Sequence, residues 1–124
     1  MTVPSNRILV VDDDPMQLEL VERGLERDGF EVRCVTTVRE MTAEAKRFAP
    51  NIVLLDVNMP DAPGERTIAL ARESAPGARL VLYSAWEDSK LRVLAAQLGA
   101  DGFISKSESV LAIGSRLRTM PPGR

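Results

Sequence analysis

The chain of 124 residues contains no histidine and a single cysteine. Without histidine it cannot use His-based nucleophilic catalysis or the zinc sites that commonly depend on imidazole ligands. The single cysteine, Cys34, cannot form an internal disulfide, and its apolar, strand-like surroundings predict a small buried or half-buried thiol. These absences exclude several classes of hydrolase and zinc protein, and any fold that is held together by its own disulfides.

Long apolar runs are also lacking. The unbroken runs of four strongly apolar residues are 8–11 and 52–55, far short of the roughly 20 residues that cross a bilayer. Residues 1–7 show no charged segment followed by an apolar stretch, so we expect no signal peptide and a cytosolic protein. The net charge of −2 gives no electrostatic reason to expect direct nucleic-acid or membrane binding.

Apolar segments of strand length recur five times along the chain, at residues 8–11, 30–35, 52–55, 80–83 and 102–104. The first and third are wholly apolar, which is typical of strands buried on both faces of a sheet. Segments with apolar residues at helical spacing lie between and after them. Five alternations of strand and helix predict an α/β fold, in which helices cover both faces of a parallel sheet. The length suits about one domain.

Several residues mark where the helices begin and end. Asp14 followed by Pro15 predicts an N-cap and a first helical residue, and Thr37 with Glu40 has the spacing of a capping box. Helix ends are expected at Gly29, Gly99, Pro50 and Pro76. We expect one domain over residues 1–124, with a core at about 7–117 and a flexible tail at 118–124.

Polar residues stand directly after four of the five expected strands. Asp12 and Asp13 follow the first strand, Asp56 the third, Ser84 the fourth and Lys106 the fifth. The carboxyl ends of parallel strands share one edge of the sheet, where ligands of open α/β folds bind. We therefore expect these five side chains to converge.

The convergence of three carboxylates requires a compensating positive charge. Two like charges at 4 Å cost about 4 kcal/mol at an effective dielectric constant near 20. Carboxylate oxygens, water and a backbone carbonyl suit Mg²⁺, and Lys106 adds a second positive charge. Because an aspartate can accept a phosphoryl group covalently, the set predicts a phosphoryl site on a metal-bound carboxylate.

Each of these residues also has an ordinary structural interpretation when taken alone. An aspartate after a strand is commonly a turn or cap residue, and Asp14 is expected to be only a cap. Ser84 could cap the fourth helix with Glu87 at capping-box spacing. Lys106 alone would be a solvated surface charge. The combination of complementary residues at four strand ends favours the functional interpretation.

Taken together, these motifs resemble those of the receiver domains of two-component response regulators, over about residues 7 to 117. The matching features are the acidic pair Asp12-Asp13, the phosphoacceptor segment Asp56-Val57-Asn58-Met59-Pro60 with Gly64, Ser84 followed by Ala85, Phe103, and Lys106. The resemblance implies a flavodoxin-like (βα)5 fold, doubly wound, with a five-stranded parallel sheet in the order 2-1-3-4-5.

The resemblance also implies a Mg²⁺ site. Asp13 and Asp56 would supply side-chain oxygens, Asn58 would supply its backbone carbonyl, and Asp12 would act through water. Asp56 would accept a phosphoryl group from a sensor histidine kinase, a phosphotransfer protein or a small donor such as acetyl phosphate.

The resemblance further implies a switch. Lys106 and Ser84 would bind phosphoryl oxygens, and Phe103, at the aromatic switch position, would turn inward behind Ser84. The surface of the fourth helix, fifth strand and fifth helix would then change, to control a downstream protein or an effector domain lost from the chain. A homodimer through the same surface is also compatible with the family.

Three positions depart from the family pattern or extend it. Ser107 follows Lys106 where many members have proline, so we expect a trans peptide, a shifted loop and Ser107 as an alternative cap of the fifth helix. Phe103 replaces a common tyrosine. Trp86 either shields the acyl phosphate from water or is a partly exposed loop aromatic.

Three functions compete at this point. The first is a phosphorylatable receiver, which would turn over no metabolite and so would not be an enzyme. The second is a receiver-like interaction module that works without phosphate. The third is a small Mg²⁺-dependent phosphohydrolase, which is disfavoured because Asn58 occupies the position of the acid/base aspartate and no cap domain is present.

Overall fold

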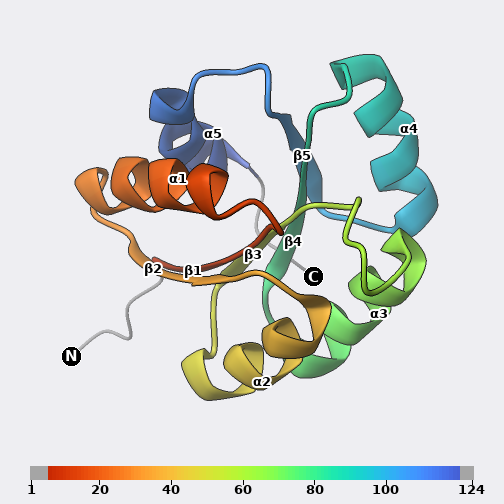
Figure 1. The fold of residues 1–124 in the computed structure, drawn as a ribbon. Helices are drawn as coiled ribbons and strands as arrows, with labels where there is room; N and C mark the ends of the chain where they lie inside the picture. Colours follow the sequence, from red (N-terminus) through yellow and green to blue (C-terminus); the bar gives the residue numbers. More distant parts are fainter. Residues whose placement is uncertain (1–5, 121–124) are drawn as a thin grey trace.

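The computed structural model describes residues 6–120, in which strands and helices alternate (Figure 1). The elements in chain order are β1 (Arg7–Val11), α1 (Pro15–Arg27), β2 (Glu31–Val35), α2 (Val38–Phe48), β3 (Ile52–Leu55), α3 (Gly64–Ser74), β4 (Arg79–Ser84), α4 (Asp88–Leu98), β5 (Gly102–Ser105), the 3-10 helix η1 (Val110–Ala112) and α5 (Ile113–Thr119). None of the helices in this part of the chain has the length and hydropathy to cross a membrane.

The five strands form one parallel sheet in the order β2-β1-β3-β4-β5. This confirms both the alternating pattern and the strand order that the family resemblance implied. Every residue of β3 is buried, and only the first residue of β1 is partly exposed. Strands buried on both faces need apolar side chains throughout, which explains the two wholly apolar runs of the sequence.

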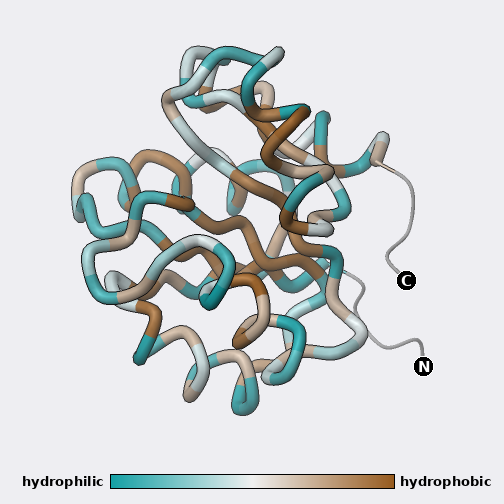
Figure 2. The backbone as a smooth tube through the Cα atoms, turned by 90° about the vertical axis from the view of Figure 1, so that its right-hand side faces the viewer, coloured by the Kyte–Doolittle hydropathy of each residue, from teal (hydrophilic) through white to brown (hydrophobic). Residues whose placement is uncertain are grey.

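Helices cover both faces of the sheet, with α1 and α5 on one side and α2, α3 and α4 on the other (Figure 1). Alternate residues of each strand serve the two layers: Leu9 and Val11 pack towards α2, whereas Ile8 and Val10 pack towards α1. The strongly apolar stretches run through the middle of the molecule and the hydrophilic ones lie around them (Figure 2). This double core fixes the strand ends that carry the polar residues.

Most of the expected helix boundaries are confirmed. The Asp14 side chain accepts from the Met16 and Gln17 backbone N–H groups, with Pro15 at the first helical position. The Thr37 hydroxyl accepts from the Glu40 N–H at 3.0 Å, as in a capping box. Helix-ending residues in the left-handed region include the expected Gly29 (φ 90°) and Gly99 (φ 72°).

Two alternative cap assignments, Ser84 for α4 and Ser107 for α5, are wrong because these helices begin later than the assignments assumed. The N-cap of α4 is Glu87, without a side-chain hydrogen bond, and Ser84 instead closes β4. Ser109, not Ser107, caps the 3-10 turn that precedes α5, by accepting from the Leu111 N–H. The described residues contain no cis peptide, as expected for Lys106-Ser107.

The helix α5 continues through Thr119, two residues beyond the expected end of the core. The expected flexible tail begins inside this helix, and residues 121–124 lie outside the described residues.

Candidate functional site

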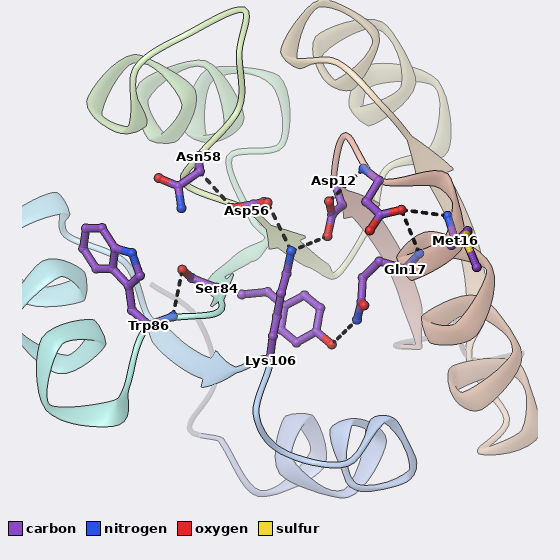
Figure 3. Close-up of polar contacts among 10 residues, drawn as sticks. Asp12, Met16, Gln17, Asp56, Asn58, Ser84, Trp86 and Lys106 are labelled. Carbon is purple, nitrogen blue, oxygen red and sulfur yellow. Dashed lines mark hydrogen bonds and ion pairs between the residues drawn. The ribbon is translucent and has the colours of Figure 1, made fainter.

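The polar residues that follow the strands meet at one edge of the sheet, as expected. Asp12 follows β1, Asp56 follows β3 and Lys106 follows β5, while Ser84 is the last residue of β4. Strands β1, β3, β4 and β5 are consecutive neighbours in the sheet, so their carboxyl ends lie side by side. Figure 3 shows Asp12, Asp56, Ser84 and Lys106 gathered around one small volume.

Three carboxylates form the negative half of the site. One oxygen from each of Asp12, Asp13 and Asp56 lies within 4.8 Å of the others. Asp12 is 1% exposed and Asp56 is 6% exposed, whereas Asp13 is open to solvent. The open side of the cluster is therefore at Asp13, where an ion or a phosphodonor can approach.

The ammonium group of Lys106 bridges the two buried carboxylates (Figure 3). Its Nζ atom lies 2.7 Å from Asp12 Oδ2 and donates to Asp56 Oδ2 at 3.2 Å. Burial acts to lower the pKa of Lys106, but the contact with Asp12 and the charge of Asp56 outweigh it, so the pKa is raised. Lys106 is therefore charged at neutral pH, and one cation faces three carboxylates.

The donor set fits a divalent cation of the Mg²⁺ type. Asp12 Oδ2 is deeply buried, and its partner is the Lys106 ammonium group, whose Nζ atom lies 2.7 Å away. The other oxygens are partly satisfied: Asp12 Oδ1 accepts from the Asp14 N–H at 3.0 Å, and Asp56 Oδ1 from the Asn58 N–H at 2.9 Å. Excess negative charge and hard oxygen donors are what Mg²⁺ prefers.

Two residues that the sequence did not reveal support Lys106. The Lys106 Nζ atom lies 5.4 Å from the centre of the Tyr83 ring, and Tyr83 is 1% exposed. The Gln17 side-chain amide donates to the Tyr83 hydroxyl at 2.8 Å. Burial raises the pKa of Tyr83, so its hydroxyl is neutral and its ring holds Lys106 through cation–π attraction. Only the register of β4 against β5 could have placed Tyr83 beneath Lys106.

The Ser84 hydroxyl is directed to the backbone of the following loop (Figure 3). It accepts from the Trp86 N–H at 3.3 Å, and Ser84 is fully buried. The Ser84 carbonyl accepts from the Lys106 N–H at 2.6 Å, which joins the ends of β4 and β5. Trp86 is 42% exposed and lines a groove with Asn58 and Leu94, which fits a partly exposed loop aromatic close to the site.

Phe103 lies on β5, three residues before Lys106, and is partly exposed. The Arg92 guanidinium, from α4, lies 5.6 Å from the centre of its ring. Arg116 of α5 pairs with Glu108 and reaches the Phe103 carbonyl at 3.5 Å. The Phe103 side chain therefore lies beside α4, on the face of the sheet that α2, α3 and α4 cover.

The fold and the site define an α/β protein with an acidic pocket and a bridging lysine at the carboxyl edge of its sheet. The family model "Response regulator receiver domain" matches residues 8–118. The chain therefore belongs to the response regulator receiver domains of two-component signalling.

Relatives at moderate identity agree with this assignment. The transcriptional regulatory protein PrrA of Mycobacterium tuberculosis is 31% identical over 118 residues, which cover 95% of this chain and 51% of PrrA. The chain thus spans about half the length of such curated relatives.

Two solved structures show the same fold. A CheY-like receiver domain protein of Methanospirillum hungatei JF-1 has a TM-score of 0.79 and 27% identity, over 91% of this chain and 90% of that one. A response regulator protein of Burkholderia pseudomallei, determined with a phosphorylated aspartic acid, a calcium ion and citrate, has a TM-score of 0.78 and 26% identity. The match covers 94% of this chain and 66% of that one.

Proposed function

We propose that this receiver domain accepts a phosphoryl group on Asp56 in a Mg²⁺-dependent reaction and uses it as a switch. The observation that carries the proposal is the Lys106 ammonium group, which bridges Asp12 and Asp56 beside the open carboxylate of Asp13. A purely structural ion pair would need one carboxylate, whereas three carboxylates around one lysine leave negative charge for a further cation.

The residues that would hold Mg²⁺ are Asp13 and Asp56 through their side chains, Asn58 through its carbonyl, and Asp12 through water. When bound, the ion would neutralise charge on the phosphoryl group during transfer. The Burkholderia pseudomallei regulator, whose structure contains a phosphorylated aspartic acid and a calcium ion, supports this assignment.

The chain itself supplies the nucleophile and a cation. A carboxylate oxygen of Asp56 forms the new O–P bond as the P–N bond of a phosphohistidine breaks, and the electron pair leaves on the imidazole nitrogen, which takes up a proton. With acetyl phosphate the leaving group is acetate. Lys106 moves its contact from the Asp56 oxygen to a phosphoryl oxygen, and Ser84 donates its hydroxyl hydrogen to another.

The output of the switch is a changed surface at α4, β5 and α5. Phosphorylation adds about −1.5 to −2 charges and three acceptors, which favour the arrangement in which Ser84 and Lys106 both reach them. Phe103 then follows Ser84 inward. The donor is a sensor histidine kinase or a phosphotransfer protein. The target is a downstream protein or an attached effector domain, as in relatives named as transcriptional regulators.

The test is incubation with acetyl phosphate and Mg²⁺, followed by intact mass. We expect one phosphoryl group per chain, no gain in EDTA and none in Asp56→Asn. The matched control is Asp14→Asn, which removes a neighbouring carboxylate but retains a helix cap. Absence of a Mg²⁺-dependent gain in the wild type would contradict the proposal and favour a phosphate-independent interaction module.

A further inference from the structure

The hydroxyl groups of Ser105 and Ser107 form a polar contact next to the acidic cluster that phosphoryl transfer does not use. Ser105 is the last residue of β5 and is 1% exposed, while Ser107 lies on the exposed loop that follows. Their Oγ atoms are 2.8 Å apart, and the Ser107 N–H donates to the Ser105 Oγ at 3.2 Å. A buried hydroxyl with this many partners has a defined orientation.

The direction of these hydrogen bonds follows from the last acceptor in the series, the Trp86 carbonyl. The Ser105 Oγ lies 3.0 Å from the carbonyl oxygen of Trp86, which can only accept. Because a hydroxyl carries one hydrogen, Ser105 donates to Trp86 and Ser107 donates to Ser105. The hydroxyl chain thus connects the loop after β5 to the loop after β4, and its members polarise one another.

The peptide groups of Trp86 are therefore held by two neighbouring strands. Its N–H donates to the Ser84 hydroxyl on β4, and its carbonyl accepts from Ser105 on β5. Ser84 and Ser105 are directly paired in the sheet, so the two anchors lie side by side. Figure 3 shows the Ser84 hydroxyl pointing to the Trp86 amide. The orientation of Ser84 is thus coupled to the position of the loop at residues 85–87.

We infer that Ser105 and Ser107 are positioning residues that hold this loop, and with it the Ser84 hydroxyl, in the unphosphorylated arrangement. The inference rests on the proposed function, in which Ser84 leaves Trp86 to bond a phosphoryl group on Asp56. That movement releases the Trp86 N–H and shifts the loop, and it is opposed by the bond from Ser105 to the Trp86 carbonyl, which is made only before the loop shifts. Bonds that exist only in the unphosphorylated arrangement lower the population of the phosphorylated arrangement. They therefore weaken the apparent affinity for a phosphoryl group.

The experiment compares Ser105→Ala and Ser107→Ala with two controls. Ser109→Ala removes a hydroxyl of the same loop, the one that caps η1. Ser105→Thr retains the hydroxyl at the buried position. The half-saturating concentration of beryllium fluoride with Mg²⁺ is measured by the fluorescence of Trp86, the single tryptophan. The rate of labelling by acetyl phosphate is measured by intact mass, which does not depend on Trp86.

We expect Ser105→Ala to bind beryllium fluoride about three- to tenfold more tightly and to label faster, since one state-specific hydrogen bond has about that effect. Ser107→Ala should change both in the same direction by less, because the Ser105–Trp86 bond remains. Ser105→Thr and Ser109→Ala should behave as the wild type. If the hydroxyl groups were merely structural, their removal would lower the melting temperature without tightening the binding of beryllium fluoride.

Unchanged or weaker binding in both alanine variants, with a wild type that is labelled normally, would overturn the inference alone. A wild type that neither labels nor responds to beryllium fluoride would overturn the proposed function and the inference together. If Ser105→Ala melts below the assay temperature, the exposed Ser107→Ala decides the outcome, because its hydroxyl is outside the core.

Discussion

At the scale of single residues, Lys106 has the least replaceable side chain of the site. It is the cation within reach of both Asp12 and Asp56, and these carboxylates are almost completely buried. A buried charge without a partner costs far more than a solvated one, because it loses its hydration without compensation. Lys106 therefore contributes to stability as well as to phosphoryl binding.

Lys106→Met should lower the free energy of unfolding by about 1–3 kcal/mol in EDTA, because Asp12 and Asp56 lose their cation. The side chain of Lys106 is 19% exposed, which keeps the expected loss below that of a fully buried pair. Urea unfolding measures the loss, with Lys46→Met, on the exposed side of α2, as the control. Equal stability of the two variants would show that the carboxylates are solvated without Lys106.

Cys34 should be almost unreactive in the folded protein. Burial, followed by the charges of Glu22 and Glu26, raises the pKa of its thiol from 9.0 to about 12. The reactive species is the thiolate, so at pH 8 the ionised fraction falls from about a tenth to about one part in ten thousand. We expect reaction with a disulfide reagent to be at least about a hundredfold slower than in urea. Rapid labelling of the native protein at pH 8 would contradict the burial.

The raised pKa of the Cys34 thiol makes the free energy of unfolding depend on pH in a definite direction. Because the pKa of Cys34 is raised on folding, its contribution to stability is complete below pH 9 and is lost as the pH rises towards about 12. Cys34→Ser or Cys34→Ala should reduce the loss of stability above pH 9, which urea unfolding at several pH values would measure.

The sequence predicted which residues converge but not what holds them. Asp12, Asp56 and Lys106 could be placed because each directly follows an apolar strand, and parallel strands end at one edge. Ser105 and Tyr83 gave no such signal, because their partners are set by the neighbouring strand and by the loop after β4. Contacts of this kind depend on sheet register, which a single sequence with one apolar run per strand does not specify.

At the scale of the elements, the cap predictions show the same limit. Asp14 and Thr37 were identified correctly because a cap residue, a helix former and an apolar face occurred together at the required spacing. Ser84 with Glu87 has the same spacing, yet Ser84 remains in β4, where its carbonyl is bonded to the Lys106 N–H. At Ser84, strand pairing therefore outcompeted a local capping motif. At α2, the first N–H groups donate to Asp61, a residue distant in sequence.

The packing of α5 on α1 depends on a missing side chain at Gly114. A Cβ atom at this position would stand 3.0 Å from Asp28 Cγ and closer still to its Oδ2 atom. Arg118, one turn later, donates to the Asp28 carbonyl and lies over the Phe30 ring, 4.4 Å from its centre. The end of α1 is therefore fixed against α5, and Asp28 has little freedom to withdraw.

Gly114→Ala should therefore destabilise the protein by about 1–2 kcal/mol, although alanine is the better helix former. The control is Gly77→Ala, where a Cβ meets nothing within 4 Å, and which should be neutral or slightly stabilising. Thermal unfolding measures both. Combining Gly114→Ala with Asp28→Ala should recover part of the loss, and strict additivity of the two changes would contradict the proposed clash.

At the scale of the whole molecule, the fold places repulsive charges on a well-packed frame. The two apolar layers bury the strands, and the sheet brings Asp12, Asp13 and Asp56 together at its edge. Repulsion among these carboxylates lowers the stability of the fold in the absence of a cation, and binding of a cation removes this repulsion. The folded state therefore gains from Mg²⁺ because the unfolded chain cannot hold the three carboxylates together.

Mg²⁺ should raise the melting temperature of the wild type in a saturable way. The free energy of unfolding should increase by about 1.4 kcal/mol when the Mg²⁺ concentration is ten times the dissociation constant. Asp13→Asn removes one of the three charges at the solvent-exposed position, so it should be equally or more stable than the wild type in EDTA and lose most of the gain from Mg²⁺. Thermal unfolding over a Mg²⁺ series at constant ionic strength measures both effects. Asp14→Asn, the adjacent carboxylate outside the cluster, should retain the full gain. If Asp13→Asn and Asp14→Asn responded alike, the stabilisation would come from general screening of the acidic surface and not from an ion held between the ends of β1 and β3.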